Sequence, residues 1–171
     1  AELKTQLNNI SVDTKYLTID SYSLDYKTFE ILINDINITT ADHMQYLYIL
    51  YNCGNLDICQ LFYKGDVIGA AIFLKYNNVV QFHEAERFIN NTIPVHHLII
   101  WENIKYYKLA GFEMMDLGVF LYNSQINYIN TTKKDNIAIF KRGFSSNVSR
   151  FLIGEKFFKK ELFILDYTKR I

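Results

Sequence analysis

The hydrophobic and polar positions of the chain predict two helices in its first third. Apolar residues recur at helical spacing over residues 24–36 and again from Thr40 or Ala41 to Tyr51. Thr40 is a suitable N-cap for the second helix and Gly54 a suitable stop. A short strand over residues 15–19 precedes them.

The pattern then changes to one typical of strands. Residues 56–63, 67–76 and 79–88 are rich in β-branched and aromatic side chains. The tight-turn sequences Lys64-Gly65-Asp66 and Asn77-Asn78 separate them. An antiparallel meander of three strands is expected.

A third helix follows, opened by Pro94 with Thr92 as a capping candidate and closed by Gly111. Its apolar stripe is expected to contain Leu98, Trp101, Ile104 and Tyr107 or Lys108. A buried strand over residues 113–120 comes next.

The remaining pattern is weaker. A looser stretch over 121–135 precedes expected strands at 136–140, 150–158 and 161–167. The order of elements predicts a mixed α/β, or α+β, fold with a mostly antiparallel sheet flanked by helices. At 171 residues the chain is expected to form a single domain, 1–171, or one lobe of a longer protein.

Composition and charge add further expectations. No apolar run approaches the length of a membrane helix, and Cys53 and Cys59 lack zinc or disulfide spacing, which favours a reduced, cytoplasmic protein without membrane insertion. Residues 1–132 hold eight Lys/Arg against fourteen Asp/Glu, whereas 133–171 hold ten against four. The basic C-terminal quarter suits an anionic ligand, such as a phosphate-bearing donor, or a solvated surface.

Two stretches resemble a known family. A helix opened by Pro94 leads through Gly111-Phe112 to Asp116-Leu117-Gly118, and the run Phe140-Lys141-Arg142-Gly143-Phe144 follows. In this order, over roughly residues 56–150, they resemble acyltransferases of the GNAT superfamily. The likeness is to the C-terminal lobe of the Fem-type peptidyltransferases and to related acyltransferases encoded near surface-polysaccharide genes.

The resemblance implies a GNAT-like fold and an N-acyl or aminoacyl transferase. It would use aminoacyl-tRNA, a carrier-bound acyl group or acyl-CoA as co-substrate, without a tightly bound cofactor or metal, and an amine of a cell-envelope precursor as acceptor. Neither DNA binding nor a particular oligomeric state is implied. Alternatives are a CoA-dependent N-acetyltransferase and a non-catalytic lobe that binds a substrate or partner. Family members usually have two lobes, and this chain has length for one.

The resemblance also places Lys141 at a position implicated in donor binding and transition-state stabilisation. A cation beside the reacting carbonyl would meet its developing negative charge. Phe140, Arg142 and Gly143 belong to the same run and are donor-binding candidates. Each of these charged residues also suits a plain surface position.

The attacking amine must lose a proton, so a nearby carboxylate or imidazole is needed. On the third meander strand, alternation places Glu84 and Glu86 on one face and His83 and Arg87 on the other. Glu84 or His83 is the candidate base, against the simpler interpretation that both are exposed strand residues.

Four further residues are candidates for supporting roles. Asp116 lies in an apolar strand, where a charge requires a partner, and can orient the site or hold backbone. Gly118 would let a ligand approach closely, or form a bulge. His96, next to His97, can touch a ligand at the helix N-terminus, although the two cannot readily share a metal. Trp101 is expected in the core.

One absence bears on the donor. Classical CoA-dependent relatives carry a glycine-rich loop before this helix, whose backbone amides hold the pyrophosphate. Residues 87–93 contain no glycine. The expectation is therefore an aminoacyl-tRNA or carrier-bound donor rather than standard acetyl-CoA.

Overall fold

The computed structural model describes residues 7–18, 23–36, 40–89, 92–118, 132–144, 159–161 and 164. The chain divides into two compact units, Ala1–Gly118 and Val119–Ile171. The expectation of a single domain stays a prediction.

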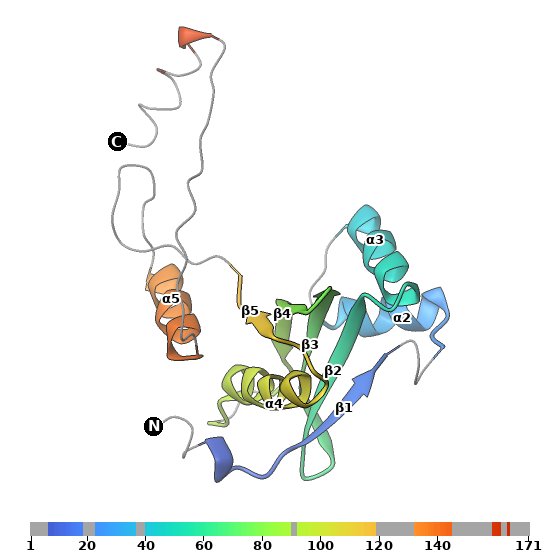
Figure 1. The fold of residues 1–171 in the computed structure, drawn as a ribbon, viewed down its shortest axis with the longest axis vertical. Helices are drawn as coiled ribbons and strands as arrows, with labels where there is room; N and C mark the ends of the chain where they lie inside the picture. The colour runs from blue at the N-terminus through green and yellow to red at the C-terminus, as the bar shows by residue number, and fades with distance from the viewer. Residues whose placement is uncertain are drawn as a thin grey trace. The chain divides into compact units, whose positions relative to one another are not determined.

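The elements follow the predicted order through the first unit. They are β1 (Asp13–Leu17), α2 (Tyr26–Asn34), α3 (Ala41–Asn52), β2 (Leu56–Tyr63), β3 (Asp66–Tyr76), β4 (Val79–Arg87), α4 (Val95–Leu109) and β5 (Met114–Asp116), with α5 (Thr132–Phe144) in the second unit. Figure 1 labels these elements, and within the first unit it shows how they are arranged.

The described strands form one sheet in the order β1-β2-β3-β4-β5. Neighbours are antiparallel except for β4 and β5, which are parallel. The predicted hairpin is confirmed: Tyr63 pairs with Asp66, and Lys64 and Gly65 form the two-residue turn with φ of 53° and 90°. Positive φ at both central positions is the type I′ requirement, and its twist matches that of the strands. The mixed fold with a mostly antiparallel sheet is therefore confirmed.

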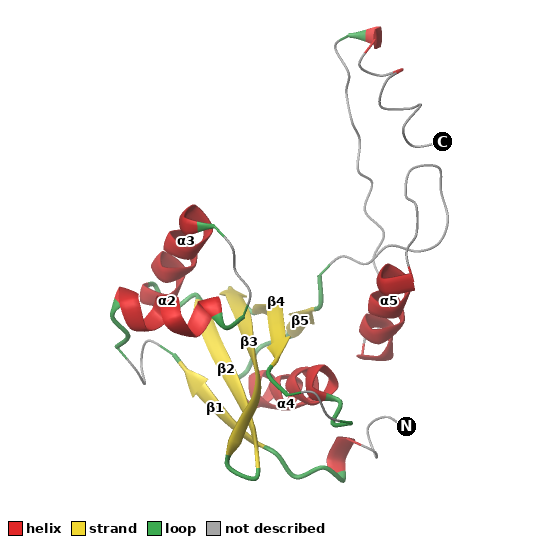
Figure 2. Ribbon diagram, turned by 180° about the vertical axis from the view of Figure 1, so that it is seen from behind, coloured by secondary structure: helices red, strands yellow, loops and turns green. Residues whose placement is uncertain are grey.

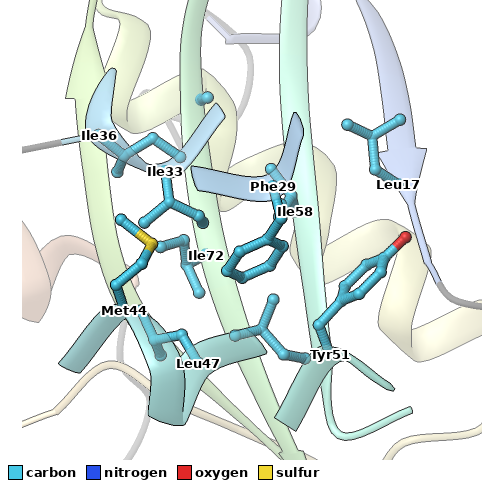
Figure 3. Close-up of a cluster of buried hydrophobic side chains, with 11 residues drawn as sticks. Leu17, Phe29, Ile33, Ile36, Met44, Leu47, Tyr51, Ile58 and Ile72 are labelled. Atoms are coloured by element: carbon cyan, nitrogen blue, oxygen red, sulfur yellow. The ribbon is translucent and has the colours of Figure 1, made fainter. Parts of the chain in front are cut away.

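Helices α2 and α3 cover one face of the sheet. Figure 2 shows the two helices on this side of the sheet. The core there joins side chains of both helices to alternate residues of β2 and β3, as Figure 3 shows. Its buried members are Leu17, Phe29, Ile33, Ile36, Met44, Leu47, Tyr51, Leu56, Ile58, Ala70 and Ile72. Burial of this apolar surface is the main force holding the two helices on the sheet.

The N-caps of α2 and α3 follow from the sequence. Asp25 accepts a hydrogen bond from the backbone N–H of Thr28 at 2.9 Å, and Thr40 accepts one from that of His43 at 3.4 Å. Such side chains satisfy N–H groups that the helix leaves unpaired. The prediction of Thr40 as a cap is thus confirmed.

Helix α4 covers the opposite face, and it packs closest at Gly69 of β3. A Cβ there would lie 2.5 Å from Cγ1 of Val95, 2.8 Å from the carbonyl oxygen of Glu86 and 3.3 Å from Cδ1 of Ile99. Gly69 has no side chain, so the first turn of α4 can rest directly on the sheet.

The apolar stripe of α4 differs from the predicted one. Residues Val95, Ile99, Asn103 and Tyr107, spaced by four, are buried together with Leu98 and Ile100. Trp101, expected in the core, is only half-buried, and its indole N–H donates to Oδ1 of Asn8 at 2.9 Å. The pattern misplaced the stripe because its third member is a polar residue. Asn103 is accommodated by donating from Nδ2 to the Ile99 carbonyl at 2.8 Å and to the Cys59 sulfur at 3.2 Å.

Helix α4 also carries a buried ionic contact with β2 and β3. The Tyr107 hydroxyl donates to Oδ2 of Asp57 at 3.0 Å, and Lys75 Nζ lies 2.6 Å from Oδ1. Asp57 is 2% exposed, so both carboxylate oxygens need these partners. This contact fixes the C-terminal half of α4 on the sheet. The close approach at Gly69 fixes its first turn.

The start of α4 and the last predicted strands require correction. Pro94 is the N-cap residue rather than the first helical one, and no side chain caps the helix, so Thr92 does not have the predicted role. Of the strand expected at 113–120, residues 113–118 are described, and among them only the three residues of β5 form a strand.

The strand expected at 136–140 is part of helix α5. Asp135 lies in its first turn and Lys141 and Arg142 in its last, so the charges complement the helix dipole. The strand prediction used only the pattern of apolar residues and did not take this distribution of charge into account. Glu161 and Ile164 are likewise helical where a strand was expected, and the strand predicted at 150–158 lies outside the described residues.

No helix in the described part of the chain is both long and apolar enough to span a bilayer.

Candidate functional site

Strand β4 is irregular at its centre. Ile72 of β3 pairs with Glu84, but the next residue, Phe73, pairs with Phe82. His83 is therefore an extra residue on β4, which defines a β-bulge. Bulges redirect side chains and occur often beside active sites.

The bulge brings His83 and Glu84 to the same side of the sheet. Ile72 belongs to the core beneath α2 and α3, and directly paired residues share a face, so Glu84 points to that side. The ring of His83 contacts the ring of His43 in α3, so it points there too. The prediction that alternation sends them to opposite faces is wrong, because the extra residue breaks the period of two.

His43 is a member of this site that sequence reasoning missed. It lies in the first turn of α3, and its ring centroid is 5.6 Å from that of His83, with the planes at 83°. The two residues are forty positions apart in the sequence. Nothing in a single sequence pairs them, since only the packing of α3 against the sheet brings the two rings together.

The electrostatics favour neutral imidazole at the bulge. Burial lowers the pKa of His83, and the neighbouring His43 lowers it further, whereas Glu84 acts in the opposite direction. The side chain is half-buried, and its Nε2 has no hydrogen-bond partner in the described structure. A neutral imidazole with an unpaired nitrogen, next to a carboxylate, can accept a proton.

Strands β4 and β5 part immediately below the bulge. Their parallel pairing covers only Val79, Val80 and Gln81 of β4. Among the described residues, the second half of β4 is paired with β3 alone. In an antiparallel pair the N–H and C=O groups of alternate residues point away from the partner, so this part of β4 offers backbone donors and acceptors along one edge.

The first turn of α4 lies near that same half of β4. Gly69 pairs with Arg87 and contacts Val95, which connects the end of β4 with the start of the helix. His96 and His97 are half-buried in this turn, and burial, aided by His96, lowers the pKa of His97. The uncapped N–H groups of a helix start attract anions.

Asp116 and Gly118 follow the parting of the strands. The expectation of a buried Asp116 is wrong, because β5 is short and its carboxylate is exposed. Oδ1 accepts a hydrogen bond from the Gly118 backbone N–H at 2.7 Å. Gly118 has φ of 73°, the left-handed region that glycine adopts without strain. Asp116 therefore shapes the turn that leaves the sheet.

The remaining candidates lie in the second unit. Phe140, Lys141, Arg142 and Gly143 all belong to α5, not to a turn after a strand. Lys141 and Phe140 are half-buried, Arg142 and Gly143 are exposed, and the Phe140 ring packs against that of Phe144 with centroids 5.7 Å apart. Their roles stay predictions.

Within the ranges given above, His, Cys, Asp and Glu side chains form no group of three or more that could hold an ion.

Comparisons with known proteins identify the fold. No family model matches the sequence. No curated protein matches it either. Solved structures do match. One is an aminoglycoside acetyltransferase from an uncultured soil metagenomic sample, crystallised with trehalose, with TM-score 0.50, 15% identity and coverage of 90% of this chain and 99% of that one.

A second similar structure is AAC(6′)-Iy in complex with a bisubstrate analogue of CoA and acetylneamine. Its TM-score is 0.52, with 12% identity over 85% of this chain and 98% of that one. The same aminoglycoside N-acetyltransferase in complex with CoA gives 0.51, with 12% identity and coverage of 85% and 95%. At such low identity the likeness shows the fold. The fold is that of the GNAT acetyltransferases, and the resemblance to Fem-type proteins finds no support among these structures.

Proposed function

We propose that this protein is an acyl-CoA-dependent N-acyltransferase that transfers an acyl group to an amine. The observation that carries the proposal is the bulged strand β4, which leaves β5 after three residue pairs and places His83 and Glu84 toward α3. The likeness of the fold to acetyltransferases crystallised with CoA and with a CoA bisubstrate analogue supports it.

The edge of β4 that has no strand partner among the described residues fits the acyl-donating arm of CoA. That arm contains amide groups, which pair with strand backbone as a neighbouring strand would. In this proposal the uncapped first turn of α4, with His96, receives the negatively charged end of the donor. Gly118 follows β5, near the point where the pairing of β4 and β5 ends, and its lack of a side chain leaves room for the donor to approach closely.

His83 and Glu84 would prepare the acceptor. An ammonium group cannot attack a thioester, so its proton must first be removed. A neutral His83 can take that proton, and Glu84, beside it, can hold the amine in place and stabilise the cationic imidazole. Developing negative charge on the carbonyl oxygen needs a hydrogen-bond donor or a cation. The role of Lys141, which lies in the second unit, stays a prediction from the sequence.

The missing glycines of residues 87–93 modify this proposal rather than exclude it. A glycine-rich loop lets phosphates approach backbone N–H groups closely. Here side chains must contribute more of the phosphate contacts, and His96, in the first turn of α4, is the proposed contact. Donor affinity should consequently fall steeply with ionic strength.

A second donor class is favoured by one observation, the basic C-terminal quarter with ten Lys/Arg against four Asp/Glu. Such a surface suits the backbone of tRNA as well as a nucleotide. Aminoacyl-tRNA as donor, with a cell-envelope amine as acceptor and the Phe140–Gly143 run as donor contact, is therefore the alternative proposal.

The proposal is tested by comparing donors side by side. Acetyl-CoA, a longer acyl-CoA and an aminoacyl-tRNA are offered with a panel of amines, and release of free thiol or of deacylated tRNA is followed. We expect thiol release with an acyl-CoA and loss of about 100-fold or more in kcat for Glu84→Gln or His83→Gln. Asp66→Asn, an exposed carboxylate in the β2–β3 hairpin, is the matched control. Turnover of aminoacyl-tRNA alone would favour the alternative, and absence of binding by every donor would refute both.

A further inference from the structure

His83 has features that packing alone does not account for. Its Nε2 is buried without a hydrogen-bond partner in the described structure, although buried polar atoms in native proteins are nearly always paired. The residue also occupies the bulge of β4, a position created by an inserted residue. Both observations single out the ring as one whose nitrogen has no structural partner among the described residues.

His43 is the residue that holds this ring from the other element. Its own position is fixed, because its backbone N–H is bound by the Thr40 cap at 3.4 Å and Met44, the next residue, is buried in the core. The perpendicular contact at 5.6 Å is the favoured arrangement for two aromatic rings. It removes water from one side of the His83 imidazole and restricts rotation about its χ angles.

We propose that His43 is a positioning residue for acyl transfer, one that fixes His83 as the neutral base for the acceptor amine. The inference rests on the proposed function. In the step concerned, the amine nitrogen forms a bond to the thioester carbonyl carbon, and the carbon–sulfur bond breaks. The ammonium form of the acceptor first gives one proton to His83. The nitrogen releases its second proton to solvent as the carbon–nitrogen bond forms, and the departing thiolate takes one from solvent. His43 itself touches neither substrate.

The charged groups around His83 give the expected direction of the effect. Glu84 on β4 favours its protonated form, and His43 on α3 and burial oppose it. Loss of the His43 ring removes both the opposing charge and part of the burial. The pKa of His83 should then rise toward its ordinary value, and the ring should become mobile.

The experiment has one arm that does not depend on activity. The chain has four histidines, so NMR titration of their ring protons can be assigned with single substitutions. The protein is compared with His43→Ala, His43→Phe and the control Gln45→Ala, an exposed position on α3. We expect the pKa of His83 to rise in His43→Ala. In His43→Phe, which keeps the ring but not the charge, a smaller rise is expected, and none in the control.

The kinetic arm separates positioning from folding. His43→Ala should lower kcat by about tenfold or more, leave KM for the acyl donor unchanged and move the acidic limb of the pH profile upward, whereas His43→Phe should retain most of kcat. An unchanged pKa of His83 in both variants would overturn the inference, as would full kcat in His43→Ala. Absence of turnover in the unmodified protein, with the NMR shifts as expected, would refute the proposed function while the coupling of the two rings stands.

Discussion

Gly69 gives the most direct test of how α4 is seated on the sheet. Its φ lies outside the left-handed region, so alanine meets no backbone strain there, and the effect of the substitution is steric. Without a clash, Gly→Ala stabilises a protein by about 0.4–1 kcal/mol through the unfolded chain. The new methyl, however, would lie 2.5 Å from Val95 Cγ1 and 2.8 Å from the Glu86 carbonyl oxygen.

The contact with backbone decides the sign. Val95 can yield only by moving the first turn of α4, and the Glu86 carbonyl is fixed in the β3–β4 ladder. Overpacking of this kind costs about 1–3 kcal/mol, which exceeds the gain from the unfolded state. We therefore expect Gly69→Ala to lower the free energy of unfolding by about 1–2 kcal/mol. The melting temperature should fall by roughly 2–4 °C for each kcal/mol.

Chemical denaturation with a double-mutant cycle measures this. Val95→Ala removes the nearest atom. The loss of unfolding free energy in the double variant Gly69→Ala/Val95→Ala should therefore be about 0.5–1.5 kcal/mol smaller than the sum of the losses in the two single variants. Rescue should be partial, because the carbonyl remains. Gly65→Ala is the control for a glycine with open space around it, where only the positive φ of 90° is strained. A Gly69→Ala protein as stable as the parent would refute the close seating of α4.

Three further expectations concern the polar groups of the first unit. Asp57→Ala leaves Lys75 and Tyr107 without their buried partner, so it should lower the free energy of unfolding by about 3–5 kcal/mol. Tyr107→Phe removes one hydrogen bond and should cost about 1–3 kcal/mol. Urea midpoints measure both losses, and equal losses would contradict a carboxylate shared by the two partners. Burial raises the pKa of the Cys59 thiol to about 12. At pH 8, iodoacetamide should therefore modify the exposed Cys53 and spare Cys59 in the folded protein. Two adducts in the mass spectrum would count against this prediction. Burial lowers the pKa of both His83 and His97, so the unfolded chain binds protons more readily than the folded one. The contribution of these histidines to the free energy of unfolding should be fully present above about pH 6.5 and decline as the pH falls below it. His83→Gln should flatten that decline in urea titrations from about pH 7 to about pH 5.

The sequence predicted most of the first unit correctly because its signals are local. The Lys64-Gly65 turn, the Thr40 cap and Gly111 with φ of 88° each depend on a few neighbouring residues. Alternation and helical spacing then placed α2, α3, the meander and α4 within a few residues of their observed bounds.

The prediction for α5 failed for the opposite reason. A run of apolar residues over 136–140 suits a strand or a helix equally, and the charges at Asp135, Lys141 and Arg142 favour the helix. The resemblance to the acyltransferase family, in which the run Phe140–Phe144 forms a turn, outweighed these charges in the prediction. It also directed the donor prediction to Lys141 and to aminoacyl-tRNA, while the similar solved structures include one with CoA and one with a CoA bisubstrate analogue.

The candidate site shows where sequence stops being sufficient. Composition and spacing selected His83 and Glu84 on the correct strand, but an inserted residue set both toward α3, and a bulge leaves no mark in a single sequence. His43 joins them only because α3 packs against the sheet. Local hydrogen bonds and periodicity determined which elements form, since they act between near neighbours. The tertiary structure alone decided which side chains meet, because strand register and helix packing depend on contacts between distant parts of the chain.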